Sequence, residues 1–257
     1  MGRVAVVTGG SSGIGAEIAR ALARDGWHCI LLARGDERLH KVAAEIGGEY
    51  AVCDVRDREA VERTAEELRE RHPAIGLLVN NAGIPGRSGF LEMAPEQIED
   101  VLRTNYLGSV WCLRAFLPAL EAGAPSAVVN NVSVEGAVAF PPVGPYAASK
   151  HAQLAFSRAL AAQLPSRGIR VHTVNAGWVE TEGFPQRTTL RPGPLHRAIV
   201  EPEAVARLVV RMLERNRREA FIPWWFRPVA VAQAVWPGLF ARVLARGGGR
   251  GFRVEDG

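Results

Sequence analysis

A glycine-rich turn near the start of the chain, at residues 8–15, constrains the possible folds more than any other feature. It follows residues 4–7, an uninterrupted apolar run that predicts a strand buried on both faces. After the turn, apolar residues recur at helical spacing as far as Gly26, which predicts a helix. Glycines at this spacing let backbone N–H groups approach a pyrophosphate at the helix N-terminus, where the helix dipole favours anions. The stretch therefore predicts a dinucleotide site, with a plain turn as the alternative, and its candidate contacts are Gly9, Ser11, Ser12, Gly13, Ile14 and Gly15.

The residues after the second predicted strand, 29–33, bear on the choice of cofactor. In sites of this type an acid about twenty residues past the glycines binds the ribose 2′-hydroxyl, whereas an arginine accommodates a 2′-phosphate. Arg34 stands at that place, and Arg38 adds positive charge nearby. Because a guanidinium binds phosphate through two parallel hydrogen bonds, we expect NADPH in preference to NADH. The alternative is that Arg34 is solvated and Asp36 binds the ribose.

Strand and helix patterns alternate along most of the chain. Repeated strand–helix units predict an α/β fold with a parallel sheet and right-handed crossovers, and ligands bind at the carboxyl ends of such strands. We therefore expect a Rossmann-like, doubly wound sheet of about seven strands with helices on both faces. One domain would span residues 1–223 and a C-terminal extension residues 224–257. The expected strands cover residues 4–7, 29–33, 50–53, 75–79, 129–132, 171–174 and 220–223.

Composition excludes several other classes. The chain of 257 residues is 47% apolar, enough for one sizeable core, and its net charge of +4 comes from dispersed arginines rather than a basic block, so we expect no nucleic-acid partner. Its cysteines fall in apolar runs without metal-ligand spacing, which predicts buried reduced thiols, no metal site and a cytoplasmic location. The N-terminus leads straight into a strand, so we expect no signal peptide.

A phenol and an ammonium group stand four residues apart at Tyr146 and Lys150, within a run that predicts a helix. Positions i and i+4 share a helix face, so both groups can reach one point. A cation ~4 Å from a phenolate favours ionisation by roughly 4 kcal/mol at an effective dielectric of ~20, about three pKa units. A tyrosine tuned towards neutrality suits general acid–base chemistry at a carbonyl. A solvated ion pair is the alternative for this spacing taken alone.

Together these motifs resemble the short-chain dehydrogenases/reductases. The resemblance runs from the N-terminus to about residue 181 and covers the Thr-Gly-x-x-x-Gly-x-Gly turn, Asn-Asn-Ala-Gly at 80–83, an Asn in the next long helix, a Ser after strand five and Tyr-x-x-x-Lys. It departs at Ala176, where the family usually has proline before Gly177, so the turn there is less restricted.

The resemblance implies roles for the matching residues. Tyr146 would exchange a proton with the substrate oxygen, Lys150 would hold the nicotinamide ribose and lower the tyrosine pKa, and Ser133 would hydrogen-bond the carbonyl. Asn105 would anchor a water that links Lys150 to solvent, with a helix hydrogen bond as the alternative. Further cofactor contacts would be Asp54, Val55, Asn81, Ala82, Gly83, Gly177, Val179 and Thr181, where Asp54 meets the adenine amino group or instead caps the following helix.

The expected function is interconversion of a ketone and a secondary alcohol on a hydrophobic small molecule with NADP(H), in a homodimer or homotetramer. A non-catalytic NADP-binding regulator and an isomerase or dehydratase that uses the same site are the alternatives. Glu135 lies where the family lines its substrate pocket, and we expect a solvent-facing carboxylate there rather than a substrate contact.

Two later segments stand apart from the family pattern. Residues 182–200 lack periodicity and predict a substrate lid, and Trp178, Phe140 and Phe184 line an apolar pocket or belong to the core. Residues 224–246 are apolar, aromatic and flanked by arginines. They would cover the pocket, pack on another subunit or lie on an anionic membrane surface as a peripheral contact. We expect disorder in residues 247–257.

Overall fold

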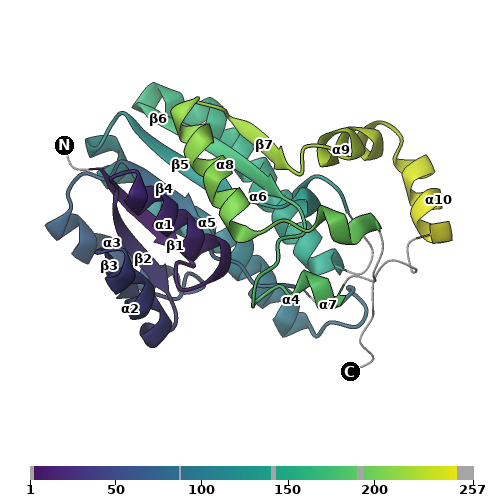
Figure 1. The fold of residues 1–257 in the computed structure, drawn as a ribbon, viewed down its shortest axis with the longest axis horizontal. Helices are drawn as coiled ribbons and strands as arrows, with labels where there is room; N and C mark the ends of the chain where they lie inside the picture. Colours follow the sequence, from purple (N-terminus) through teal and green to yellow (C-terminus); the bar gives the residue numbers. More distant parts are fainter. Residues whose placement is uncertain (1–2, 87, 140–142, 190–193, 248–257) are drawn as a thin grey trace.

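A seven-stranded parallel sheet in the order β3-β2-β1-β4-β5-β6-β7 forms the centre of the molecule (Figure 1). The computed structural model describes residues 3–86, 88–139, 143–189 and 194–247, so the expected pocket residue Phe140 and the expected disordered tail after residue 247 lie outside the described residues. The predicted doubly wound fold is confirmed. The strands are β1 (Val4–Thr8), β2 (His28–Ala33), β3 (Glu49–Val52), β4 (Leu77–Asn80), β5 (Ser126–Asn131), β6 (Ile169–Ala176) and β7 (Glu219–Ile222).

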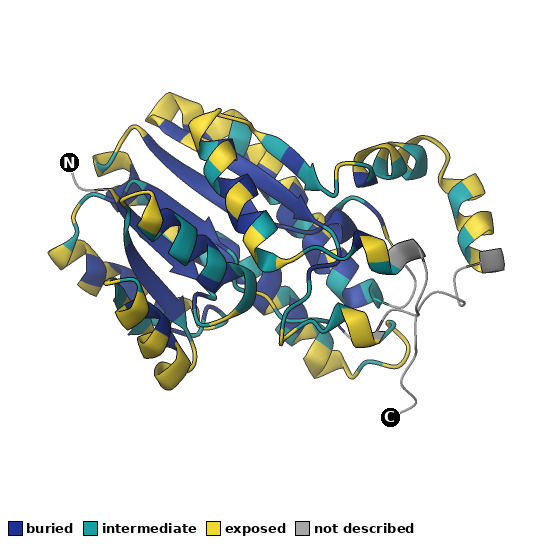
Figure 2. Cartoon of the chain, viewed as in Figure 1, coloured by how far each residue is buried: buried dark blue, intermediate teal, exposed yellow. Residues whose placement is uncertain are grey.

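Helices cover both faces of the sheet and enclose two apolar cores (Figure 2). One core lies under α1, α2 and α8, and the other lies under α3, α5 and α6. The central strands are buried throughout, which explains why their sequences read as continuous apolar runs. The helices are α1 (Gly13–Arg24), α2 (Asp36–Glu45), α3 (Arg58–Arg71), α4 (Pro95–Leu102), α5 (Gly108–Ala122), α6 (Gly144–Gln163), α7 (Gln186–Thr189), α8 (Pro202–Glu214), α9 (Phe226–Val235) and α10 (Pro237–Gly247).

At the amino ends of the strands a polar cluster joins β2, β3 and the end of α3. His28 and His72 both hydrogen-bond Oε1 of Glu49, at 2.8 and 2.7 Å, and Arg71 pairs with the other oxygen of that carboxylate. The three potential ligand atoms lie within 4.8 Å of one another, close enough to share a metal ion. Since Arg71 already neutralises the carboxylate, a hydrogen-bonded clip accounts for this arrangement, and the expected absence of a metal site stays a prediction.

The C-terminal extension forms two helices that project from one end of the sheet (Figure 1). Gln233 fixes α9 to the body through hydrogen bonds with the backbone of Ala139. Trp236, Leu239 and Val243 stay more than half exposed along α10 and its junction with α9. No single helix of the described residues is long and apolar enough to cross a membrane, although α9 and α10 pass that test as a pair bent by 112°. The three expected roles of this segment, which are to cover the pocket, to pack on another subunit or to lie on a membrane surface, stay predictions.

Candidate active site

The glycine-rich turn joins β1 to α1 and is locked to the loop after β4. Thr8 Oγ1 accepts hydrogen bonds from the backbone N–H groups of Asn81 and Ala82, at 2.9 and 3.0 Å, and the Asn81 side chain donates to the Thr8 carbonyl. A Cβ on Gly15 would lie 2.1 Å from the Gly9 carbonyl oxygen, so no larger residue fits there. Gly9 needs its φ of +67°, which glycine adopts without strain.

The first turn of α1 is free to bind an anion. Its N-cap residue, Ser12, makes no side-chain cap hydrogen bond, so the first N–H groups of the helix keep their capacity for a ligand. Gly13 has a φ of +54°, and a Cβ there would meet the Thr181 side chain at 3.1 Å. This cradle of backbone donors, with Thr181 beside it, fits the pyrophosphate of a dinucleotide.

The strand ends next to this turn carry the charges expected to choose the cofactor. Arg34 is exposed directly after β2. Asp36, the alternative ribose ligand, hydrogen-bonds the Tyr50 hydroxyl. Arg38 is paired through both nitrogens with Glu182, at 2.7 and 2.9 Å, across the mouth of the site. The Arg34 guanidinium forms no salt bridge with the described residues, although its charge acts on Asp54, whereas Arg38 would have to leave its carboxylate to bind a phosphate.

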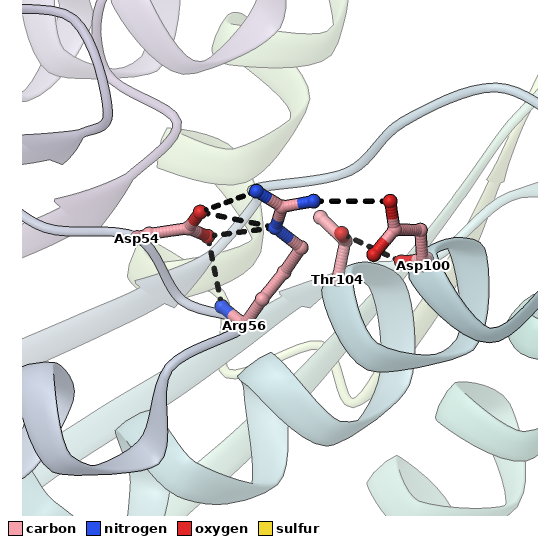
Figure 3. Close-up of polar contacts among 4 residues, drawn as sticks. All are labelled: Asp54, Arg56, Asp100 and Thr104. Carbon is pink, nitrogen blue, oxygen red and sulfur yellow. Dashed lines mark hydrogen bonds and ion pairs between the residues drawn. The ribbon is translucent and has the colours of Figure 1, made fainter. Parts of the chain in front are cut away.

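Asp54 follows β3 and is held by Arg56, which also contacts Asp100 in the last turn of α4 (Figure 3). Burial acts to raise the pKa of Asp54, but the hydrogen bonds from Arg56 outweigh it and the pKa is lowered. The expectation that Asp54 caps the following helix is wrong, because Asp57 accepts from the N–H groups of Glu59 and Ala60 instead. The adenine contact stays a prediction.

Ser133, Tyr146 and Lys150 come together at the carboxyl end of β5. Ser133 follows the strand, and Tyr146 and Lys150 lie one turn apart on α6. The Lys150 ammonium lies 5.7 Å from the centre of the Tyr146 ring, and the Ser133 side chain hydrogen-bonds the tyrosine. Ser133 and Lys150 are 7% and 3% exposed, so these two side chains are shielded from bulk water, whereas Tyr146 is half-buried.

The pKa of Tyr146 is raised rather than lowered, which corrects the expectation from the Tyr–Lys spacing. Burial is the main cause, the Glu135 carboxylate adds to it, and the hydrogen bond from Ser133 acts in the opposite direction. Burial also lowers the pKa of Lys150 to about 7. The lysine ammonium is held by the Asn131 carbonyl at 3.1 Å and Gln153 Oε1 at 2.8 Å. Desolvation thus dominates the pKa values of both residues.

Asn105 lies in a π-helical turn, η1 (Arg103–Leu107), and is buried there. Its side chain bonds the N–H and carbonyl of Ile84 and the Ser149 hydroxyl, at distances of 2.8 to 3.0 Å. This is the alternative reading of Asn105 as a structural hydrogen-bonder. A π-turn frequently marks a functional site, because it moves a side chain out of the regular helical register.

Gln153 and Ser109 make a link that sequence reasoning missed. Gln153 accepts from Lys150 and donates to Ser109 Oγ at 2.8 Å, and Ser109 in turn donates to the Asn105 backbone carbonyl. Gln153 is fully buried. Protein atoms therefore connect Lys150 to the backbone carbonyl of Asn105, and the expected water at Asn105 stays a prediction. The signal was available in the sequence, since a glutamine three residues after a lysine shares its helix face.

Glu135 is buried, and the expectation of a solvent-facing carboxylate is wrong. Glu135 is 8% exposed and lies in the short 3-10 turn η2 (Val134–Gly136). Its Oε2 has no hydrogen-bond partner among the described residues. Burial raises the pKa of Glu135 to about 8, against a lowering effect of Lys150. The sequence could not reveal this, because burial of the turn depends on packing against α6.

The remaining predicted contacts lie around the same edge of the sheet. Val55 is buried under Gly108, and a Cβ on Gly83 would approach Asn105 Oδ1 at 3.2 Å. Gly177 is fixed by a hydrogen bond to the Ile222 carbonyl, and Val179 pairs with Val200.

The segment predicted as a lid reaches the catalytic group through Phe184. Its ring centre lies 5.9 Å from that of Tyr146. Trp178 instead packs against Phe226 in a small separate core, so it belongs to the core rather than the pocket. The segment also contains a short helix, α7, and a bridge between Thr181 and Phe184.

Comparison with known proteins agrees with this geometry. Residues 3–190 match the family model described as short chain dehydrogenase. The chain is 30% identical over 261 residues to dehydrogenase/reductase SDR family member 7B of Danio rerio, covering 95% of this chain and 84% of the relative. It is 38% identical over 186 residues to a putative ketoacyl reductase of Streptomyces coelicolor, covering 69% and 71%.

A solved structure shows the same fold. An alcohol dehydrogenase from Thermococcus sibiricus, complexed with 5-hydroxy-NADP, superposes with a TM-score of 0.76 at 31% identity, covering 86% of this chain and 96% of that one. The chain belongs to the short-chain dehydrogenase/reductase family. It is an oxidoreductase that acts on CH–OH groups and their carbonyl counterparts, with a nicotinamide cofactor.

Proposed function

We propose that this protein interconverts a ketone and a secondary alcohol with NADP(H), and that Tyr146 is the proton donor and acceptor. The single observation that carries the proposal is that half-buried Tyr146 lies against two buried polar side chains, Ser133 and Lys150. A non-catalytic binding protein would have no use for a phenol, a hydroxyl and an ammonium group gathered in this way. An isomerase or dehydratase would use the same residues, and it would produce no net change in nicotinamide absorbance.

The chain's own residues have distinct tasks in the proposed reaction. A bound nicotinamide supplies or accepts the hydride. Ser133 donates a hydrogen bond to the substrate carbonyl oxygen and stabilises the charge that develops there. Tyr146 delivers its proton to that oxygen during reduction and removes it during oxidation. Lys150, charged near neutrality, holds the cofactor ribose and attracts the phenolate that is left behind.

The NADP preference rests on Arg34. It is exposed at the end of β2 and faces solvent, where a 2′-phosphate of a cofactor bound along the cradle would lie. The competing acid, Asp36, is hydrogen-bonded to Tyr50. Replacing Arg34 with Ser should therefore weaken NADPH by about 1.5 to 3 kcal/mol, the worth of a charged hydrogen bond, and leave NADH almost unchanged.

The test is turnover of a panel of ketones and secondary alcohols, followed by nicotinamide absorbance with each cofactor. We expect a higher kcat/KM with NADPH than with NADH. Tyr146→Phe should lose about 10²- to 10⁴-fold in kcat, while its dissociation constant for NADPH stays unchanged. Wild-type turnover retained by this variant would refute the role of Tyr146, and a clear preference for NADH would refute that of Arg34.

The assembly and surface contacts of the protein are a separate proposal. We propose a homodimer or homotetramer in which α5 and α6 pack across a two-fold axis, in a cytoplasmic protein whose apolar α10 surface rests on anionic lipid. Residues 220–254 contain arginines and no acidic residue, which favours a negatively charged partner. Light scattering and pelleting with phosphatidylglycerol vesicles, with and without Leu239→Glu, test the two parts. A variant that pelleted like the wild type would exclude lipid contact through α10.

A further inference from the structure

Glu135 is the buried titratable group at the catalytic centre that the proposed reaction does not use. Its backbone N–H donates to Ser133 Oγ at 3.2 Å, so the residue is anchored to the side chain proposed to hold the substrate oxygen. Its charge acts on both Tyr146 and Lys150, which places the carboxyl group inside the same shielded space.

The carboxyl group has an unused hydrogen-bonding atom. Oε2 of Glu135 is inaccessible to solvent and has no partner among the described residues. A buried polar atom without a partner costs about 1 to 3 kcal/mol, so such an atom in a native site calls for an explanation. A ligand that brings a donor to this atom removes the cost when it binds.

Resting on the proposed function, we propose that Glu135 is a specificity-determining residue that binds a hydroxyl group of the substrate, one or two carbons from the reacting carbonyl. The substrate class is therefore the hydroxyketones and the corresponding diols or polyols, rather than purely hydrocarbon ketones. Phe184 beside Tyr146 supplies an apolar wall for the rest of the molecule.

A hydroxyl fits this site better than an ammonium group. A hydroxyl both donates and accepts, so it can bind the carboxyl group in either protonation state. A substrate ammonium would share the pocket with Lys150, whose own positive charge would repel it. Amino ketones should therefore bind more weakly than their hydroxyl counterparts.

The experiment compares matched ketones in matched variants. The probes are 2-butanone, 3-hydroxy-2-butanone and 3-methoxy-2-butanone, the last of which retains the electron-withdrawing oxygen without its proton. In the wild type with NADPH we expect a higher kcat/KM for 3-hydroxy-2-butanone than for 2-butanone. Glu135→Leu should reduce the ratio of these two kcat/KM values by about 10- to 100-fold, the worth of a hydrogen bond to a buried acidic group. Glu135→Gln, which keeps a donor and an acceptor, should retain part of the preference. The ratio of the two ketones is the readout rather than the absolute rate, because loss of the carboxyl also changes the charges around Tyr146 and Lys150.

The readings separate this inference from the proposed function. An unchanged ratio in Glu135→Leu, or an equal loss with the methoxy compound, would overturn the hydroxyl contact while leaving the oxidoreductase intact. Tighter binding of 3-amino-2-butanone than of the hydroxyketone would overturn the choice of ligand class. If no ketone turns over, dissociation constants of the same probes for the NADPH complex, measured by calorimetry, decide the question through the same ratio.

Discussion

On the β1–β2 side of the sheet the candidate cofactor contacts are backbone groups and exposed charges, whereas on the β5–β6 side the candidate catalytic contacts are buried side chains. The glycine turn has its shape fixed by close backbone approaches, such as that of Gly15 to Gly9. Lys150, Gln153 and Glu135 instead lie in a shielded space where each charge affects the others. The first region should therefore respond to changes in shape, and the second to changes in charge.

The largest expected effect comes from the turn. Gly15→Ala places a Cβ 2.1 Å from the Gly9 carbonyl oxygen and 2.5 Å from the Asn81 side chain, so the cradle must open. We expect NADPH to bind about 100-fold more weakly, close to 3 kcal/mol, when measured by fluorescence titration. Gly35→Ala is the matched control, because a Cβ there meets nothing within 4 Å. Equal affinities of the two variants for NADPH would contradict the expectation that the first region responds to changes in shape.

In the second region, burial of Glu135 should make the stability of the folded protein depend on pH. The pKa of Glu135 is raised to about 8, so the folded protein keeps a proton there that the unfolded chain releases above its ordinary value of 4.5. Stability from this group is complete below pH 4.5 and is lost as the pH rises towards 8. Glu135→Gln cannot ionise, so its advantage over the wild type should grow over that window to at most a few kcal/mol.

Urea unfolding of the wild type and of Glu135→Gln from pH 5 to pH 9 measures this difference in stability. The groups that face the Glu135 carboxyl are Ser133, Tyr146 and Lys150. The exposed Glu182→Gln serves as a control and should show no such trend. A difference between Glu135→Gln and the wild type that stayed constant with pH would mean that the carboxyl is solvated in solution.

Gln153 provides a sharper test of the same side. Its Oε1 accepts from the Lys150 ammonium and therefore favours the charged form of the lysine, whose pKa burial lowers to about 7. Gln153→Leu should lower that pKa further, so activity on the alkaline limb of the kcat profile should fall at a lower pH, with about a tenfold loss at pH 7. Gln163→Leu, at the exposed end of the same helix, should change neither the alkaline limb of the kcat profile nor the activity at pH 7. A uniform loss at all pH values would indicate a purely structural role.

Local patterns account for what the sequence predicted correctly. The strand–turn–helix around residues 4–24 and the one-turn spacing of Tyr146 and Lys150 depend on neighbours in the chain, so they could be read directly. The cysteines were also correctly expected to be buried and unpaired. The parallel arrangement of the strands then brings their carboxyl ends to one edge of the sheet, where the site residues meet.

The features of the site that the sequence did not reveal depend on contacts between residues far apart in the chain. The burial of Glu135 depends on packing against α6, and the Arg56 contact with Asp100 joins residues 44 apart. The raised pKa of Tyr146 required knowledge of how much water remains around the phenol, which no spacing supplies. The Gln153 link was visible as a polar residue on the Lys150 face of a helix, but its partner Ser109 comes from α5.

The smallest expected effect concerns Arg38 and Glu182, which pair across the mouth of the cofactor site. Both side chains are about two-thirds exposed, at 65% and 67%, so their ion pair is worth little. Glu182→Gln releases the Arg38 guanidinium for a 2′-phosphate, so KM for NADPH should fall by roughly two- to fivefold and KM for NADH should stay constant. The effect should shrink with added salt, because exposed charges are screened. A rise in KM for both cofactors would instead show that the pair holds the loop after β6 in place, and the exposed side of the comparison would then depend on shape alone.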